Sequence, residues 1–212
     1  MPHTERAARA AAAVQRFVET DLDRLLDERA GADPMPAALA RFQRAAASVP
    51  AYAAFLRERG IDPASVRGPD DWRRLPLMTK ADYFHRYPLP ELCRDGDLSA
   101  CDMVAVSSGS TGEPTFWPRA LADELAVASR FEQVFRDSFG ADEQPTLAVV
   151  CFPLGTWVGG MFTAAVCRHL ATKGYPITVV TPGNHRRDKN TILRNVSGKQ
   201  FVYTVQVQNK YL

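Results

Sequence analysis

A loop rich in hydroxyl groups and glycine, residues 107–115, directly follows a short apolar segment, residues 103–106, and this pairing constrains the fold most. The apolar segment predicts a buried strand, and the loop predicts a turn at its end. Glycines let the backbone approach an anion and turn N–H groups toward it, and Ser and Thr hydroxyls add further donors. The loop therefore predicts a site for a polyphosphate such as that of ATP. The residues assigned to this site are Ser107, Ser108, Gly109, Ser110, Thr111, Gly112 and Thr115.

A Walker loop and a flexible linker both fit these residues less well. The Walker pattern requires Lys after its last glycine, but no Lys follows Gly112, which argues against a kinase or GTPase. A Gly/Ser linker would be flexible and carry no chemistry. Against a linker, the segment 103–106 reads as a strand before the loop, and Pro114 and Phe116 follow it. The context therefore favours a phosphate loop.

Three segments upstream of the loop add to the pattern. They are Val49-Pro50-Ala51-Tyr52, Gly60-Ile61-Asp62-Pro63 and Leu75-Pro76-Leu77-Met78-Thr79-Lys80-Ala81-Asp82-Tyr83. In this order, and with the loop, they resemble the phenylacetate–CoA ligase-like branch of the adenylate-forming (acyl/aryl-CoA synthetase) superfamily. Many adenylate-forming enzymes have Lys where this chain has Thr115, whereas this branch typically has Thr. The resemblance covers roughly residues 40–184.

The resemblance implies an ATP- and Mg²⁺-dependent ligase that converts an aryl or acyl acid into its adenylate and then into a coenzyme A thioester. The loop would bind and position the β- and γ-phosphates, and no catalytic residue is assigned. The chain has no Tyr-Gly-x-Thr-Glu type motif for adenine and Mg²⁺, no assignable Asp for the ribose and no C-terminal domain with a catalytic Lys. We therefore expect an N-terminal fragment that is not catalytically competent by itself. The alternatives are a non-catalytic nucleotide-responsive or interaction module that keeps the fold, and a nonfunctional gene remnant.

The fold class expected is α/β, with a helical N-terminal region followed by an incomplete layered adenylation domain. The uncharged stretch 145–167 is long enough to cross a bilayer, but Pro153 and three glycines divide it into a strand at 147–152 and a helix from about 156 to 173. A further apolar segment, 177–180, completes a parallel strand–helix–strand unit.

Helices are expected through most of residues 1–100. The first begins near Thr4 and continues past Leu25, because apolar residues recur at helical spacing until Gly31. A second covers about 36–48, and Thr79 is expected to cap another with Asp82 in its first turn. After the loop, an amphipathic helix is expected from residue 121 to a stop at Gly140.

Residues 1–184 are assigned to the N-terminal portion of one large domain, with the helical region at 1–100 and the phosphate loop and strand–helix–strand unit at 101–184. Residue usage changes after Gly183, since every Asn in the chain lies beyond it. One hypothesis is that residues 185–212 follow a truncation or frameshift. The competing explanation is a native tail that forms an edge strand with alternating residues at about 200–205.

Phe152, Trp157 and Val158 fall where the strand at 147–152 ends and the next helix begins. Ligands of open α/β sheets bind outside such carboxyl ends, and an aryl or acyl group needs apolar walls. In the family that the chain resembles, the corresponding region helps to line the carboxylate pocket. Ordinary core packing is the alternative for each of these residues.

Charge and composition limit the classes of molecule that the chain is expected to bind. A net charge of +2 and the lack of a basic stripe with interleaved aromatics argue against nucleic acid and an anionic membrane. The four His residues are scattered and no Cys-x-x-Cys pair occurs, so no metal site is assigned and free thiols in a reducing compartment are expected. We expect a cytoplasmic protein whose ligand is a small carboxylic acid. Exposed sheet edges could hold a partner chain or a second copy.

Overall fold

A computed structural model of the chain describes residues 3–107, 113–152, 154–155, 158–182 and 200–204. Its helices are α1 (His3–Glu19), α2 (Leu22–Asp27), α3 (Met35–Ser48), α4 (Pro50–Glu58), α5 (Pro69–Arg73), α6 (Leu121–Phe139) and α7 (Val158–Thr172). Short turns of 3₁₀ or π helix are η1 (Pro63–Ser65), η2 (Lys80–Phe84), η3 (Leu89–Leu92) and η4 (Arg94–Gly96). The strands are β1 (Met103–Val106), β2 (Phe116–Arg119), β3 (Thr146–Val150), β4 (Ile177–Val180) and β5 (Gln200–Thr204).

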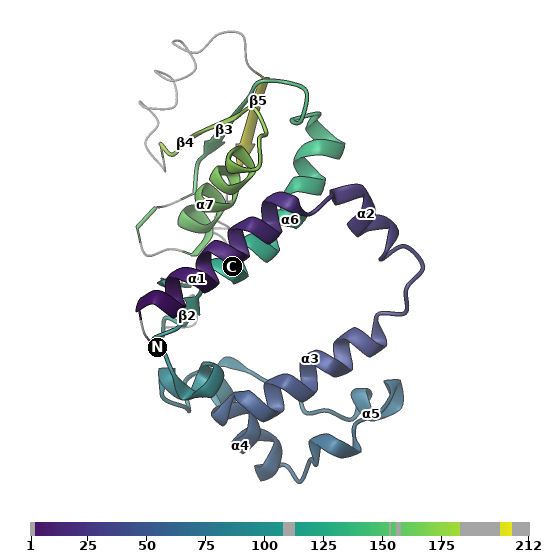
Figure 1. Cartoon of the computed structure of the whole chain (residues 1–212). Coiled ribbons are helices and arrows are strands. Elements are labelled where there is room, and N and C mark those ends of the chain that lie inside the picture. The colour runs from purple at the N-terminus through teal and green to yellow at the C-terminus, as the bar shows by residue number, and fades with distance from the viewer. Residues whose placement is uncertain (1–2, 108–112, 153, 156–157, 183–199, 205–212) are drawn as a thin grey trace, which may run out of the picture.

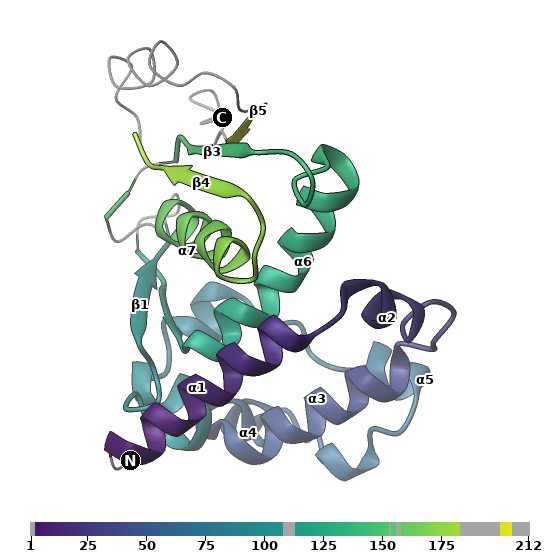
Figure 2. The same ribbon diagram turned by 45° about the horizontal axis from the view of Figure 1, so that its top comes forward.

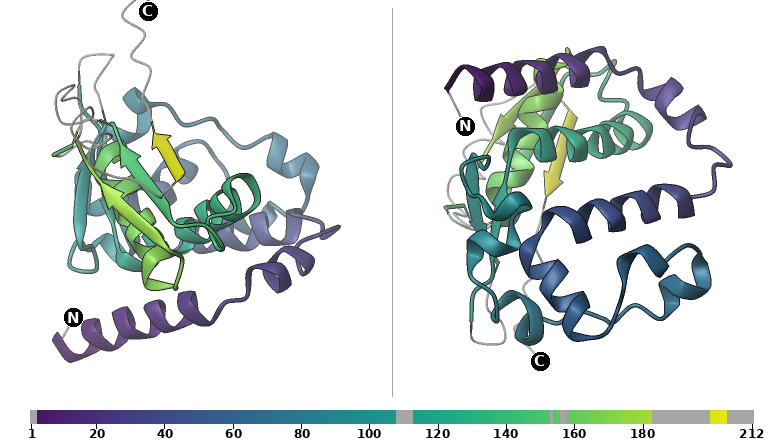
Figure 3. Two further views of the ribbon diagram at one scale, coloured as in Figure 1. Left: turned by 90° about the horizontal axis from the view of Figure 1, so that it is seen from above. Right: turned by 60° about the horizontal axis from the view of Figure 1, so that its bottom comes forward.

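The sheet of β3, β4 and β5 has the order β4-β3-β5, and both pairings of β3 are parallel (Figure 3). The crossover from β3 to β4 contains α7, so the expected parallel strand–helix–strand unit is confirmed. Every residue of β3 is buried, as expected for a central parallel strand that is covered on both faces. β5 lies within the segment where the alternating pattern predicts an edge strand.

The main core lies between this sheet and three helices. In Figure 2, α7 lies under β3 and β4, and α6 and α1 lie beyond it. Alternate residues of β3 face opposite sides: Ala148 packs with the helices, whereas Leu147 and Val149 form a small cluster on the other face. The helices contribute small or apolar side chains to this core, including Phe17, Ala128, Phe135, Val166, Cys167 and Leu170.

The helices α3, α4 and α5 form a separate part of the structure, on the opposite side of α1 and α6 from the sheet (Figure 1). Its core contains Phe42, Phe55, Leu56 and Tyr83. The rings of Phe55 and Tyr83 pack edge to face with their centroids 5.4 Å apart. The predicted cap of η2 is confirmed, because Thr79 and Asp82 form a capping box.

Two sequence expectations need correction. The single N-terminal helix is interrupted, since α1 ends at Glu19 and α2 begins at Leu22. The side chain of Asp21 accepts a hydrogen bond from the Arg24 N–H (2.9 Å) and caps α2, so a new helix starts although the apolar spacing continues. The second correction is β2, which lies between the phosphate loop and α6, where the sequence predicted no strand.

The predicted stop of α6 is confirmed. Gly140 has φ of 57° and its N–H donates to the Arg136 carbonyl (2.9 Å), while the Ala141 N–H reaches the Phe135 carbonyl (3.1 Å). A left-handed residue at this position ends the helix and satisfies its last carbonyls. No helix in the described part of the chain is long and apolar enough to cross a membrane.

Candidate functional site

The predicted phosphate loop connects the two strands of an antiparallel hairpin. β1 pairs with β2 so that Met103 lies opposite Arg119 and Val106 lies opposite Phe116. Beyond the last pair, the Ser107 N–H donates to the Thr115 carbonyl at 2.9 Å, and the Ser107 hydroxyl approaches the same oxygen at 3.4 Å. Ser107 and Thr115 therefore close the stem, and the loop between them is the tip of the hairpin. The other assigned loop residues, Ser108, Gly109, Ser110, Thr111 and Gly112, lie outside the described residues.

Thr115 has an unusual side chain for a residue at the end of a stem. The residue is only 3% exposed, and its Oγ1 is buried without a hydrogen-bond partner among the described residues. A buried hydroxyl without a partner costs about 1–3 kcal/mol, because its hydrogen bonds to water are lost and not replaced. A phosphoryl oxygen is an acceptor that would remove this cost.

The base of the hairpin is fixed to two helices through Asp102. Its N–H donates to the Arg119 carbonyl (2.8 Å), and its Oδ2 accepts from the Leu121 N–H (2.6 Å), the first residue of α6. Its Oδ1 pairs with Arg6 of α1, whose guanidinium also donates to the Ser99 carbonyl (3.1 Å). Burial alone would raise the pKa of Asp102, but the hydrogen bonds from Arg6 and Leu121 outweigh it and lower the pKa.

Aromatic contacts hold the flanks of the hairpin. The Trp117 ring lies 5.2 Å from that of Phe84 in η2, measured between centroids. On the other side, the guanidinium of Arg119 lies 4.1 Å from the centroid of the Phe162 ring in α7. The stem of the hairpin is thus fixed through β2 both to η2 and to α7.

No local signal in the sequence marks Arg6 or Asp102 as residues that hold the site. They lie 96 positions apart, and each falls in a stretch whose charge has an ordinary solvated explanation. Their pairing becomes visible only when α1 packs along α6, as it does in Figure 1.

Of the residues predicted to line an acyl or aryl pocket, Phe152 and Val158 lie in the described part and Trp157 lies outside it. Phe152 follows β3 by two positions, and Val158 is the first residue of α7. Both are half-buried, and the Phe152 ring lies over the first turn of α7, where a Cβ on Gly159 would be 3.7 Å from Cδ1 of the ring. The carboxyl end of β3 therefore carries apolar side chains, as predicted, and their contact with a ligand stays a prediction.

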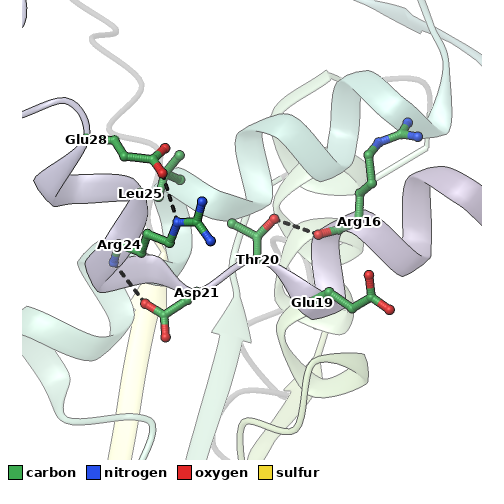
Figure 4. Close-up of a pocket in the computed structure, with 7 residues that line it drawn as sticks. All are labelled: Arg16, Glu19, Thr20, Asp21, Arg24, Leu25 and Glu28. Carbon is green, nitrogen blue, oxygen red and sulfur yellow. Dashed lines mark hydrogen bonds and ion pairs between the residues drawn. The ribbon is translucent and has the colours of Figure 1, made fainter.

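Cavities of ligand size occur elsewhere on the chain. The cavity in Figure 4 has a volume of about 400 Å³ and lies at the junction of α1 and α2. Its polar groups bond to one another: Arg24 Nε to Glu28 Oε1 (2.9 Å), and Thr20 Oγ1 to the Arg16 carbonyl (2.6 Å). We assign it no ligand, since it lies away from the hairpin. A second cavity, of about 330 Å³, lies against β2 and includes Phe116, Trp117 and Pro118 in its wall.

The described residues do not contain a group of three or more His, Cys, Asp or Glu side chains that could hold a metal ion. No Mg²⁺ ligand is therefore assigned to a side chain of this site.

Comparison with known proteins supports the resemblance seen in the sequence. No protein-family model matches the chain. Over 145 residues, the chain is 28% identical to the phenylacetate-coenzyme A ligase of Thermus thermophilus, and the match covers 68% of this chain and 31% of the relative. The resemblance to the phenylacetate–CoA ligase branch is thus confirmed by homology.

Solved structures show the same fold. A 2-hydroxyisobutyryl-CoA ligase with its acyl adenylate and CoA, in the thioesterification state, matches with a TM-score of 0.56 at 19% identity, over 91% of this chain and 35% of that one. The same ligase in the postadenylation state with its acyl adenylate matches with a TM-score of 0.55 over 34% of that chain. The α/β fold of adenylate-forming CoA ligases is confirmed, and the chain spans about a third of the length of the proteins that it matches.

Proposed function

We propose, from homology to a phenylacetate–CoA ligase and the fold shared with acid–CoA ligases, that residues 107–115 bind the phosphates of ATP in an AMP-forming acid–CoA ligase. In that reaction an acid and ATP give an acyl adenylate and pyrophosphate, and coenzyme A then takes the acyl group as a thioester with release of AMP. The chain would supply the N-terminal portion of the large domain that carries out the first step.

The role proposed for the loop is to bind and orient. Backbone N–H groups next to glycine and the hydroxyls of Ser107–Ser108, Ser110–Thr111 and Thr115 would donate to the β- and γ-phosphates, which holds the α-phosphorus in line with the carboxylate. No proton transfer is assigned to them. When bound with ATP, Mg²⁺ would supply charge neutralisation for the departing pyrophosphate.

The observation that carries the assignment is the Thr115 hydroxyl. It is buried and unpaired within the described structure, beside the tip of a hairpin whose stem is anchored to α1 and α6. Buried polar atoms in folded proteins nearly always have a partner, and an exception calls for a specific explanation. Donation of a hydrogen bond from the Thr115 hydroxyl to a phosphoryl oxygen would provide such an explanation.

The substrate proposed is an aryl or medium-length acyl acid, because apolar side chains surround the carboxyl end of β3. Phe152 and Val158, with Trp157, would contact the apolar part of the acid and leave its carboxylate for the adenylation site. We place the protein in the cytoplasm.

The test is a calorimetric titration of the purified chain with ATP, tripolyphosphate and adenosine. A phosphate loop predicts that tripolyphosphate competes with ATP and that adenosine does not. Gly109→Val should weaken ATP binding by about 10-fold or more, because a side chain would stand where the backbone approaches the anion. The assignment is lost if adenosine competes as well as tripolyphosphate, or if Gly109→Val leaves the ATP affinity unchanged while the circular dichroism spectrum is native.

Acid-dependent pyrophosphate exchange, measured on the same protein, separates a ligase portion from an autonomous enzyme. Adenylation also needs contacts to adenine, ribose and metal, and no motif in this sequence is assigned to them, so we expect no exchange with a panel of aryl and acyl acids. ATP binding without exchange fits the proposal. Exchange by the wild-type chain that is lost in Gly109→Val would keep the loop assignment and show that the chain is a complete adenylating enzyme.

A further inference from the structure

Two of the four cysteines come together beside the hairpin. Cys93 lies between η3 and η4, and Cys101 lies two residues before β1. Both are half-buried, and both line the cavity of about 330 Å³ that lies against β2. The Cys93 thiol donates to the Leu89 carbonyl (3.4 Å), and the two thiols lie close enough to interact with one another, while burial raises the pKa of both.

The chain holds both cysteines in place through their backbone. The Cys93 N–H donates to the Pro90 carbonyl (2.9 Å), and the Cys101 N–H donates to the Leu98 carbonyl (3.0 Å). Arg6 of α1 donates to the Cys101 carbonyl (3.0 Å) while it also pairs with Asp102. The proximity of the thiols is therefore built into the local fold.

The other two cysteines are more deeply buried than Cys93 and Cys101. Cys151 follows β3 and is 5% exposed, and Cys167 is fully buried in α7. Thiols in such positions react slowly with reagents in solution, because the attacking thiolate must reach the reagent. The chain thus contains its own internal control for thiol reactivity.

We propose that Cys93 and Cys101 form a thiol–disulfide site, at which a small organic disulfide converts the two thiols into an intrachain disulfide. In the first step one cysteine thiolate attacks the reagent, forms a mixed disulfide and releases one reagent thiol. In the second step the other cysteine attacks the sulfur of the first, the protein disulfide forms and the second reagent thiol leaves. The two cysteines are oxidised, one reagent disulfide is reduced to two thiols, and no other oxidant is needed.

The surroundings of the pair indicate which reagents fit. Asp97 and Asp123 line the same cavity, with Arg94 as its one cation among the described residues. The excess of negative charge favours a neutral or cationic disulfide over an anionic one. Cystamine, which carries two ammonium groups, is therefore the probe of choice.

The disulfide would connect two parts of the molecule. η3 packs against α4, in the helical part, whereas Cys101 leads directly into the hairpin stem. The crosslink would fasten the helical part to the hairpin at a second point, next to the Trp117–Phe84 contact. The proposal does not depend on what the hairpin binds.

The test is treatment of the folded full chain with cystamine, followed by mass spectrometry of the intact protein and of tryptic peptides. We expect a product that is lighter by two hydrogen atoms and is restored by dithiothreitol. Trypsin cleaves after Arg94, between the two cysteines, so the disulfide would join two separate peptides.

Variants distinguish the pair from general oxidation. Cys93→Ser should stop at a mixed disulfide on Cys101, and Cys151→Ser and Cys167→Ser should form the crosslink as the wild type does. The proposal is overturned if the wild type accumulates stable mixed disulfides at Cys93 or Cys101 without the crosslink, or if Cys151 or Cys167 is oxidised first. It is also overturned if the folded chain does not react while the chain in urea does.

Discussion

The ammonium group of Lys173 lies 2.7 Å from Oε1 and 2.8 Å from Oε2 of Glu132, and both side chains are almost completely buried. Glu132 lies on α6 and Lys173 follows α7. Lys173 also donates to the Thr20 carbonyl (2.5 Å), and the Tyr175 hydroxyl donates to Glu132 (3.0 Å). This buried network joins α6, the end of α7 and the connection between α1 and α2.

Removal of one charge should therefore cost more than removal of both. Lys173→Met leaves a buried carboxylate without its cation, and such a change costs about 3–5 kcal/mol of unfolding free energy. The double variant Glu132→Leu, Lys173→Met should cost less than Lys173→Met alone, because an apolar pair replaces the ions. Urea denaturation of the wild type, both single variants and the double variant measures this.

Tyr175→Phe is the companion to these variants, since the double variant leaves the tyrosine hydroxyl without its acceptor. Adding Tyr175→Phe to the double variant should recover part of the unfolding free energy that the double variant still lacks relative to the wild type. If the losses of unfolding free energy in Glu132→Leu and Lys173→Met simply add up in the double variant, the two ions contribute independently of one another, which would contradict this prediction.

Gly140 provides a second prediction, about the end of α6. Its φ of 57° is unfavourable for a residue with a Cβ, although a Cβ there would meet only Gln144 at 3.6 Å, an ordinary contact. Gly140→Ala should therefore lower the unfolding free energy by about 1–2 kcal/mol through the backbone alone. Gly140→Asn should cost less.

Gly68→Ala is the matched control for this prediction. Gly68 has an extended backbone (φ −158°), and nothing lies within 4 Å of a Cβ built there. This change should be neutral or stabilise the protein by less than about 1 kcal/mol, because it restricts only the unfolded chain. If chemical denaturation shows equal losses of unfolding free energy for Gly140→Ala and Gly68→Ala, the backbone explanation is contradicted.

The sequence predicted the strand–helix–strand unit of β3, α7 and β4 well, because the sequence signals for it are local. An uninterrupted apolar strand, breakers at Pro153 and Gly155 and a following helix are properties of neighbouring residues, and β3, α7 and β4 form where those signals place them. The end of α1 had a local signal too, Asp21 as an N-cap, but the apolar spacing beyond it favoured a continuous helix.

β2 had a local signal against it. Pro118 lacks an N–H and argues against a central strand. The residue lies opposite Val104 in a ribbon that has two strands among the described residues, and a missing donor is tolerated at the edge of a sheet. The sequence therefore missed that residues 107–115 connect the two strands of a hairpin, and the phosphate-binding role of this loop stays a prediction. The anchoring of that hairpin by Arg6 and Asp102 depends on tertiary packing and has no local signal.

A third prediction concerns acid stability. The Thr79 N–H and the Thr79 hydroxyl donate to Asp82 Oδ1 (2.7 and 2.8 Å), and these bonds, helped by Arg59, lower the pKa of Asp82. Because the pKa is lower in the folded state than in the unfolded one, the stabilisation is present above the ordinary pKa of Asp, about 3.9, and is lost as the pH falls through the folded value.

Unfolding free energy measured from pH 6 down to pH 2 should decline less steeply for Asp82→Asn than for the wild type, and the variant should be less stable at pH 6. Thr79→Ala should raise the pKa of Asp82 toward its ordinary range, since one donor is lost and the N–H remains. NMR titration of the Asp82 carboxyl measures that shift directly, and an unchanged pKa would show that the hydroxyl does not contribute.

The last prediction returns to Thr115, whose buried hydroxyl has no partner in the described structure. Thr115→Val replaces that hydroxyl with a methyl group of similar size, so the desolvation cost disappears without a cavity. The ATP-free protein should become more stable by up to about 1–3 kcal/mol. The same change should weaken binding of ATP and of tripolyphosphate, because a donor to the phosphates is lost.

Thr146→Val is the control for Thr115→Val. Thr146 on β3 is also fully buried, but its hydroxyl donates to the Gln144 carbonyl at 2.8 Å. Its replacement should destabilise the protein by about 1 kcal/mol or more, since a hydrogen bond made by a buried hydroxyl is lost. Thermal and chemical denaturation of both variants, with and without ATP, measures these changes in stability. If Thr115→Val destabilises the ATP-free protein as Thr146→Val does, the Thr115 hydroxyl has a partner within the fold, and the reason to assign it to a phosphate disappears.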